Sequence, residues 1–281
     1  MAAQEAQLIT VLFWNLARNA ATLPHLECLA KSHDVDVFLL AEAPKDLNLG
    51  LTKLNALGAG LYQEPAFPRP KVRVLTRMAS SDFKAVFTGD ARDMTIWAAR
   101  STKLPAGEVL LAVVHLPSKM GGNTSENQLI LAGHVSREIV EQENDRRHQN
   151  TIVVGDFNMN PFDAGMTHVT GFHGHMTRAL AERRDRDHRG NRYRRFYNPM
   201  WGHFGDQTSG PAGTYYWDSS VPSNHYWSIF DQVLIRPAMI DYLTGLEILD
   251  HDKVHPLTRA NKIPYKKHLS DHLPIIFKID I

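Results

Sequence analysis

The segment TIVVGDFNMNP, residues 151–161, joins a run of β-branched apolar residues to an abruptly polar turn. Thr, Ile and Val favour a buried β-strand, whereas Asp and Asn are poor strand formers, and a carboxylate beside a core is costly to desolvate. Asp156 and Asn158 are two residues apart, so in an extended chain they lie on one side while Phe157 faces the other. We therefore predict a buried strand that ends in two polar groups with a specific task.

Seven other apolar runs have the length and the β-branched or aromatic content of strands. They are residues 8–14, 35–41, 72–77, 94–100, 108–116, 230–235 and 273–279. Many are apolar on both alternating faces, which indicates sheets that are covered on both sides. Helical patterns lie between the runs, the clearest at 125–148 with Ser125 as the expected N-cap. This arrangement predicts a mixed α/β protein with two stacked sheets between helices.

The composition is that of an ordinary globular protein of 281 residues, 43% of them hydrophobic. We expect residues 1–281 to form a single domain, with a long Arg- and aromatic-rich insertion without regular structure at about 176–228. The formal net charge is +1, so attraction to a polyanion requires a local basic patch. One cysteine, Cys28, precludes an internal disulfide, and the chain shows neither a signal peptide nor an apolar run of about 18 residues. We expect a cytoplasmic protein without a membrane span.

Polar residues stand at the edge of almost every long apolar strand. Asn15, Glu42, His115, Asp156 and Asn158 follow their strands, and Asp231, Asp271 and His272 precede theirs. Antiparallel neighbours bring the end of one strand to the start of the next, so these groups are expected to meet in one cleft. Each has an ordinary explanation when taken alone, as a turn residue, a cap, an Asx-turn or a hydrogen-bonded core histidine. Their joint occurrence is what favours a site.

The residue types also fit one chemistry. Carboxylates and an amide oxygen are hard ligands suited to Mg²⁺ or Mn²⁺. Histidine and asparagine donate hydrogen bonds to phosphate oxygens, and a carboxylate without a metal partner can take a proton from water. The set therefore predicts metal-assisted hydrolysis of a phosphate ester. The chain has neither an HExxH motif nor paired CxxC motifs, which argues against a dedicated zinc site.

The ordered motifs resemble the endonuclease/exonuclease/phosphatase superfamily, which includes exonuclease III, deoxyribonuclease I, neutral sphingomyelinases and inositol polyphosphate 5-phosphatases. They are WN at 14–15, E at 42, H at 115, GDFN at 155–158, D at 231 and SDH at 270–272. The resemblance implies a four-layered α/β/β/α sandwich of two mixed, mainly antiparallel sheets flanked by helices. It also implies Mg²⁺ as cofactor, with Mn²⁺ as a possible substitute.

The resemblance assigns a role to each matched residue. Glu42 would be the principal metal ligand, with Asn15 and Asp271 close to the ion. Asp156 would position or deprotonate the attacking water, and Asn158 would hold both Asp156 and the scissile phosphate.

Three further residues would act on the phosphate. His272 would contact it and stabilise its transition-state charge, or act as a base, and Asp231 would orient the His272 ring. His115 would bind phosphate or assist the leaving group. Relatives of the abasic-site type often have tyrosine there, and exonuclease III-like repair enzymes tend to have glutamine before the glutamate, where this chain has Ala41. Both departures weaken a repair assignment.

Two segments indicate nucleic acid as the substrate. RRDRDHRGNRYRRFY, residues 183–197, interleaves arginines with aromatics, and we expect Arg192, Arg194 and Arg195 to bind a phosphate backbone. Residues 213–232 contain further aromatic residues, and two of these, Trp217 and Trp227, could stack on bases. The alternatives are a solvated face for the first segment and a satellite core for the second. Ser118 and Lys119 could meet a phosphate or belong to a solvated loop.

The predicted function is a metal-dependent nuclease that cleaves phosphodiester bonds. The first alternative is a phosphatase or phosphodiesterase of the same fold acting on a small molecule or a lipid headgroup. The second is a non-catalytic nucleic-acid-binding module, although such a protein would tend to lose the metal carboxylate or the final histidine, and this chain keeps both.

Overall fold

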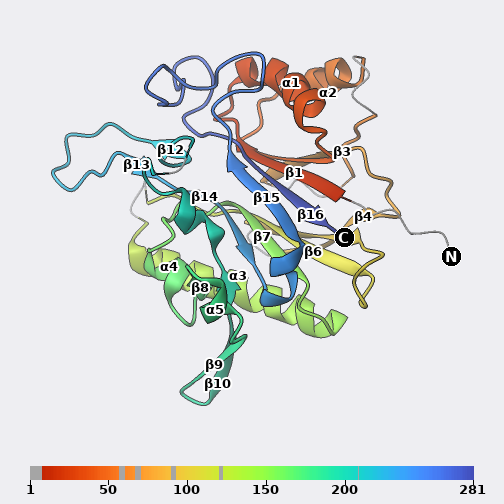
Figure 1. Ribbon diagram of the computed structural model, residues 1–281, viewed down its shortest axis with the longest axis vertical. Coiled ribbons are helices and arrows are strands. Elements are labelled where there is room, and N and C mark those ends of the chain that lie inside the picture. Colours follow the sequence, from red (N-terminus) through yellow and green to blue (C-terminus); the bar gives the residue numbers. More distant parts are fainter. Residues whose placement is uncertain (1–7, 57–60, 67–70, 90–92, 120–122, 208) are drawn as a thin grey trace.

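The strands form two stacked sheets, with helices on both outer faces (Figure 1). The protein is described by a computed structural model covering residues 8–56, 61–66, 71–89, 93–119, 123–207 and 209–281. The five-stranded sheet has the order β15 (Leu243–Ile248), β16 (Ile275–Asp280), β1 (Leu8–Asn15), β2 (Val37–Ala41) and β3 (Val72–Thr76). Within it β1 and β2 are parallel, and the other neighbours are antiparallel.

The second sheet has seven strands and is also mixed. Its order is β4 (Phe83–Thr88), β5 (Met94–Arg100), β6 (Glu108–His115), β7 (Thr151–Asp156), β14 (Asp231–Ile235), β11 (Phe196–Tyr197) and β8 (Gly174–His175). Here β6 runs parallel to β7 and β11 parallel to β8, whereas the remaining neighbours are antiparallel. All eight predicted strands are present, and the predicted sandwich of two mixed, mainly antiparallel sheets is confirmed.

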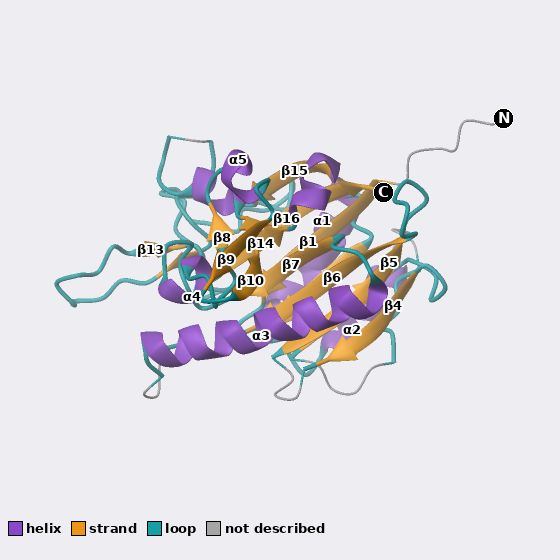
Figure 2. Cartoon of the chain, turned by 90° about the horizontal axis from the view of Figure 1, so that it is seen from below, coloured by secondary structure: helices purple, strands orange, loops and turns teal. Residues whose placement is uncertain are grey.

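Helices complete the four layers. Helices α1 (Leu23–His33) and α2 (Leu47–Ala56) lie on the side of the five-stranded sheet, and α3 (Ser125–Arg146) crosses the outer face of the seven-stranded sheet (Figures 1 and 2). The N-cap of α3 is Thr124 and not the expected Ser125, because the Thr124 hydroxyl accepts a hydrogen bond from the Asn127 N–H. The short helices are α4 (Ala164–Thr167), α5 (Arg178–Ala181), η1 (Ala20–Thr22), η2 (Pro199–His203) and η3 (Pro237–Tyr242).

Strand periodicity divides the seven-stranded sheet between two apolar cores. In β7, Ile152 and Val154 face the core shared with the other sheet, and Val153 faces the core under α3. This two-sided burial explains why the predicted strands are apolar throughout rather than alternating. Gly155 completes β7 for a steric reason: its φ is +153°, and a Cβ there would lie 1.9 Å from the Val114 carbonyl oxygen of β6. A side chain at this position would separate the strands just before Asp156.

The segment at 176–228 contains more regular structure than its sequence predicts. It holds α5, β11 and η2, the hairpin of β9 (Asp185–His188) with β10 (Asn191–Arg194), and the hairpin of β12 (Tyr215–Tyr216) with β13 (Trp227–Ser228). These elements span only two to five residues, so they carry no measurable periodicity. Within the described part of the chain, every helix is too short or too polar to cross a membrane.

Candidate active site

The predicted polar strand ends meet at one edge of the sandwich, around a cavity of about 1000 Å³. The predicted site residues that line it are Asn15, Glu42, His115, Ser118, Lys119, Asp156, Asn158, Trp217, Asp271 and His272. Trp217 directly follows β12, and the others arrive from the carboxyl ends of β1, β2, β6 and β7 and from the segment that precedes β16. Asp231, at the start of β14, is fully buried and pairs in register with Asp156. The convergence expected from the strand ends is therefore present.

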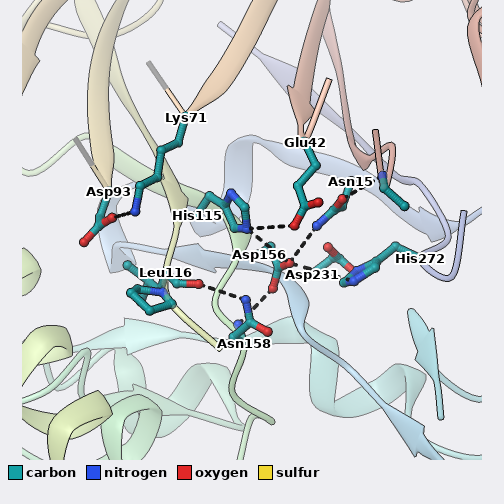
Figure 3. Close-up of polar contacts among 12 residues, drawn as sticks. Asn15, Glu42, Lys71, Asp93, His115, Leu116, Asp156, Asn158, Asp231 and His272 are labelled. Carbon is teal, nitrogen blue, oxygen red and sulfur yellow. Dashed lines mark hydrogen bonds and ion pairs between the residues drawn. The ribbon is translucent and has the colours of Figure 1, made fainter. Parts of the chain in front are cut away.

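Asp156 lies at the floor of this site and is held by two neighbours (Figure 3). Its Oδ2 accepts a hydrogen bond from the Asn15 amide at 3.0 Å, and its Oδ1 accepts the Asn158 backbone N–H at 2.9 Å. The side chain is 1% exposed, so both contacts fix a carboxylate that water can reach only from the cavity. Asn158 has a left-handed φ of 50° and donates its own amide to the Leu116 carbonyl at 2.8 Å. The polar turn after β7 thus orients Asp156.

His272 and Asp231 form a buried pair next to Asp156. The His272 Nδ1 is 2.8 Å from Asp231 Oδ2, and its Nε2 is 3.9 Å from Asp156 Oδ2. Burial of the imidazole disfavours its charged form, but the Asp231 and Asp156 carboxylates outweigh this and raise the pKa of His272 to about 10. Burial raises the pKa of Asp231, against the opposing effect of His272. Asp156, Asp231 and His272 also lie close enough to share a metal ion. Asp231 is fully buried and does not line the cavity, so the pair is better interpreted as a carboxylate that orients His272.

His115 faces Asp156 from the opposite side. Its Nε2 is 3.9 Å from Asp156 Oδ2 and 3.9 Å from Glu42 Oε1, distances too long for direct hydrogen bonds. Asp156 Oδ2 is therefore flanked by two imidazole nitrogens, with gaps that a water can bridge. Glu42 directly follows β2 with a left-handed φ of 43°, and its side chain is 29% exposed.

The predicted metal ligands differ in what surrounds their oxygens. Glu42 Oε2 lies 3.4 Å from the Arg18 guanidinium, and Asp271 Oδ2 lies 3.4 Å from Lys266 Nζ. Both carboxylates reach the cavity, where their oxygens are available to a hard cation. Asn15 points its amide nitrogen at Asp156, while its Oδ1 accepts the Ala17 N–H at 3.0 Å. In this arrangement Asn15 primarily orients Asp156.

Two supporting contacts fasten the SDH segment. The Ser270 hydroxyl donates to the Asn15 carbonyl at 2.6 Å and accepts the His272 N–H at 3.0 Å. The Trp14 indole N–H donates to the His272 carbonyl at 2.9 Å. Residues 14–15 and 270–272, far apart in sequence, are thereby locked together. Trp14 and Ser270 are part of the sequence motifs WN and SDH, but the sequence alone assigned neither residue a role.

Basic residues that the sequence analysis missed line one wall of the cavity. Lys71 and Arg73, at the start of β3, contact the cavity and form ion pairs with Asp93 and Glu64 respectively. The signal was a charged residue inside an apolar strand: Arg73 stands between Val72 and Val74. A charge in such a position usually faces a polar site.

Four predicted substrate-binding residues lie elsewhere. The hairpin of β9 and β10 projects from the α3 side of the sandwich (Figure 1), and Arg192 on it pairs with Asp187 at 3.5 Å. Arg194 turns inward to Glu143 of α3 at 2.7 Å. Arg195 lies 3.3 Å from His175 Nε2, and Trp227 packs against the core between the sheets. None of these four residues lines the cavity, so their part in substrate binding stays a prediction.

The comparisons with solved structures identify the fold. An endonuclease/exonuclease/phosphatase family protein from Bacteroides thetaiotaomicron is 14% identical, with 99% of this chain and 96% of that chain covered and a TM-score of 0.59. An AP endonuclease from Archaeoglobus fulgidus is 11% identical, covering 97% and 100%, with a TM-score of 0.56. D. rerio TDP2 complexed with single-strand DNA product is 16% identical, covering 98% and 100%, with a TM-score of 0.54.

No protein-family model and no curated protein sequence matches the chain. The structural likenesses nevertheless extend over nearly the whole of each chain. The protein therefore has the fold of the endonuclease/exonuclease/phosphatase superfamily, as its sequence motifs predicted.

Proposed function

We propose that this protein is a divalent-metal-dependent hydrolase of phosphate esters, and that it cleaves phosphodiester bonds in nucleic acid. One observation carries the proposal: a buried Asp156 carboxylate is fixed by Asn15 and Asn158 between the imidazoles of His115 and His272. This arrangement presents a base for water and two donors for phosphate oxygens within one cavity.

Glu42 and Asp271 are the residues that would hold the metal, with Asn15 beside them. Their carboxylates are partly exposed to the cavity, and all their donor atoms are oxygens, the donor set that Mg²⁺ prefers and Mn²⁺ tolerates. When bound, such an ion supplies charge neutralisation of the phosphate and polarises its ester bond.

Asp156 is the residue best placed to orient and deprotonate the attacking water. Its two fixed hydrogen bonds leave Oδ2 facing the 3.9 Å gaps toward His115 and His272. His272, kept cationic by Asp231, would donate Nε2–H to a phosphate oxygen and stabilise the negative charge that grows in the transition state. His115 would bind a second oxygen or protonate the leaving group.

The rim of the cavity supports an extended, base-bearing substrate. Trp217 is 44% exposed at this rim, and Lys266 Nζ lies 4.0 Å from the centroid of its ring. An exposed indole beside a cation suits base stacking next to a phosphate. Two of the solved structures reported above are an AP endonuclease and a TDP2 with single-strand DNA product, which supports nucleic acid as the substrate class.

Hydrolysis assays test the proposal. With Mg²⁺ or Mn²⁺ we expect cleavage of labelled single- or double-stranded DNA or RNA and of bis-p-nitrophenyl phosphate, and EDTA should abolish it. Asp156→Asn and Glu42→Ala should each lower kcat by about 10³-fold or more. Asp187→Asn, on the exposed hairpin, is the matched control and should leave kcat unchanged. Full turnover in EDTA, or in Asp156→Asn, would contradict the proposed mechanism.

A substrate panel separates the alternatives. Cleavage of p-nitrophenyl phosphate without cleavage of any diester would favour a small-molecule phosphatase. Salt-sensitive oligonucleotide binding without turnover would favour a non-catalytic binder. Trp217→Ala should raise KM for an oligonucleotide by about tenfold and leave KM for bis-p-nitrophenyl phosphate unchanged.

A further inference from the structure

A second group of potential metal ligands lies outside the catalytic cavity, where α1 meets the segment after β15. His25 and Cys28 are one turn apart on α1, so they occupy the same face of the helix. Asp252 and His255 come from the opposing segment, and Asp252 is also held to α1 through its carbonyl, which accepts the Ser32 hydroxyl at 3.2 Å. In Figure 1 this segment lies beside α1.

The segment that carries Asp252 and His255 is a preorganised turn. The Asp252 Oδ1 accepts the backbone N–H groups of Val254 at 2.8 Å and His255 at 2.6 Å. The Asp252 N–H donates to the His255 carbonyl at 3.0 Å, and the Leu257 N–H donates to the Asp250 carbonyl at 2.8 Å. The two side-chain bonds use Oδ1 and leave Oδ2 to face the histidines.

The donor atoms are spaced as ligands of one ion. Asp252 Oδ2 is 2.7 Å from His25 Nδ1 and 3.4 Å from His255 Nδ1, and the ligand atoms of all three residues lie within 4.8 Å of one another. A tetrahedral zinc site, with ligand bonds of about 2.0–2.2 Å, separates its ligand atoms by about 3.3 Å. Small rotations of the imidazoles would reach this geometry.

Cys28 is the candidate for a fourth donor: its thiol lies near enough to interact with the Asp252 carboxylate, although it is outside the three-residue group whose ligand atoms all lie within 4.8 Å of one another. Burial raises the pKa of its thiol, and the neighbouring Asp252 carboxylate raises that pKa further. A cysteine that binds a dication does so as its thiolate. The donor set is then two imidazole nitrogens, one carboxylate oxygen and one thiolate, which suits Zn²⁺ and not the oxygen-seeking Mg²⁺.

We propose that His25, Cys28, Asp252 and His255 form a tetrahedral site for a transition-metal dication of the Zn²⁺ class. The ligands come as two i, i+3 pairs, H-x-x-C on α1 and D-x-x-H on the turn, so neither an HExxH nor a CxxC motif is needed. The ion would clamp α1 to the segment between β15 and β16. Asp252 is fully buried, whereas the His255 side chain is 60% exposed and forms the open side of the site. The proposal is independent of the hydrolase assignment.

Cobalt substitution tests this site by its optical spectrum. The full-length protein, stripped with EDTA and carrying Glu42→Ala and Asp271→Ala to remove the catalytic ligands, is titrated with Co²⁺. We expect one equivalent to produce the intense visible bands of tetrahedral Co²⁺ and a thiolate-to-Co²⁺ charge-transfer band in the near ultraviolet. Zn²⁺ should displace the ion and bleach both.

Single substitutions in that background identify the ligands. His255→Ala removes an exposed side chain, so the fold should persist by circular dichroism while Co²⁺ affinity falls by at least tenfold. His251→Ala is the matched control, because it is 52% exposed on the same segment and should bind Co²⁺ normally. Cys28→Ser should remove only the charge-transfer band.

Absence of tetrahedral bands, or bands that His255→Ala leaves unchanged, would overturn the site. Visible bands without charge transfer would overturn Cys28 as its fourth ligand.

Discussion

Two aspartate–histidine pairs of nearly equal length lie on either side of Trp14. His272 is 2.8 Å from Asp231, and His25 is 2.7 Å from Asp252, with both aspartate side chains fully buried. Trp14 touches both regions: its indole N–H donates to the His272 carbonyl, and its ring meets that of His25 edge-on at 6.5 Å. The pairs differ in what else surrounds them.

The surroundings of each carboxylate decide what the pair can do. Near His272 the further neighbours are the Asp156 and Asp271 carboxylates, so negative charge is in excess and the imidazolium is favoured. Asp252 is different. Burial alone would raise its pKa, but the His255 and Val254 N–H groups and His25 outweigh burial and lower it. Two backbone N–H groups thus share in stabilising the Asp252 carboxylate, and its Oδ2 faces the imidazoles of His25 and His255. In the two proposed functions, the same kind of pair orients a histidine toward phosphate in one place and binds a transition-metal dication in the other.

Replacing each aspartate by asparagine should separate the two regions most strongly. Asp231→Asn should leave the protein folded but lower kcat for diester hydrolysis by about 10³–10⁴-fold, because His272 loses the group that fixes its tautomer and its charge. Asp252→Asn should leave kcat within about twofold but lower the free energy of unfolding of the metal-free protein by about 1.5–3 kcal/mol. Steady-state kinetics and urea denaturation measure the two effects.

Two outcomes would contradict this distinction between the two pairs. If Asp252→Asn lowered kcat as much as Asp231→Asn at full foldedness, the two pairs would belong to one functional unit. If Asp231→Asn kept normal kcat, His272 would not depend on its carboxylate.

A buried histidine that has no carboxylate partner among the described residues provides the contrasting pH dependence. His173 is 1% exposed, its ring lies 4.8 Å from that of His175, and burial, His175 and Arg195 lower its pKa to about 4. Because the folded pKa lies below the ordinary value of 6.5, the unfolded chain binds more protons between pH 6.5 and 4, and folding stability falls as the pH falls through that window.

His173→Gln should therefore remove part of the acid sensitivity. We expect the loss of stability between pH 6.5 and 4 to shrink by about 1–3 kcal/mol relative to the unsubstituted protein. His134→Gln, at an exposed position of α3, is the control. Urea denaturation at several pH values measures the difference, and identical pH profiles for the two variants would contradict the assignment.

The sequence predicted most of the fold because burial on both faces leaves a plain signal. All eight apolar runs are strands, but β4 and β15 were missed because both are edge strands with mostly half-buried or exposed residues. Helix α2 was missed for a similar reason, since only Leu47, Gly50 and Leu54 of its residues are buried.

The site residues could be predicted from the sequence where a polar residue ends an apolar strand. They could not be predicted where contacts between distant segments determine which partner a side chain binds. Arg194 illustrates the second case. It lies in an arginine-rich segment that suits nucleic acid, yet it turns to Glu143, which is buried and also holds the fully buried Arg236 at 2.8 Å. Nothing in the sequence of residues 183–197 indicates that Arg194 forms an ion pair with a buried carboxylate far away in the chain. Asp252 likewise looks like any turn aspartate until the fold places it against α1.

Trp14→Phe should produce the smallest effect and tests whether the two regions are coupled. Phenylalanine keeps an aromatic ring against His25 but loses the indole N–H that holds the His272 carbonyl. A neutral hydrogen bond contributes about 1 kcal/mol, so we expect kcat to fall by about three- to tenfold with KM nearly unchanged. Co²⁺ binding at the second site should stay normal, because none of its ligands is altered. Trp97→Phe, in the core of the seven-stranded sheet, controls for loss of a buried indole. If Trp14→Phe weakened Co²⁺ binding and also lowered kcat, the indole would couple the two sites energetically. The two aspartate–histidine pairs would then belong to one coupled system and would not be independent.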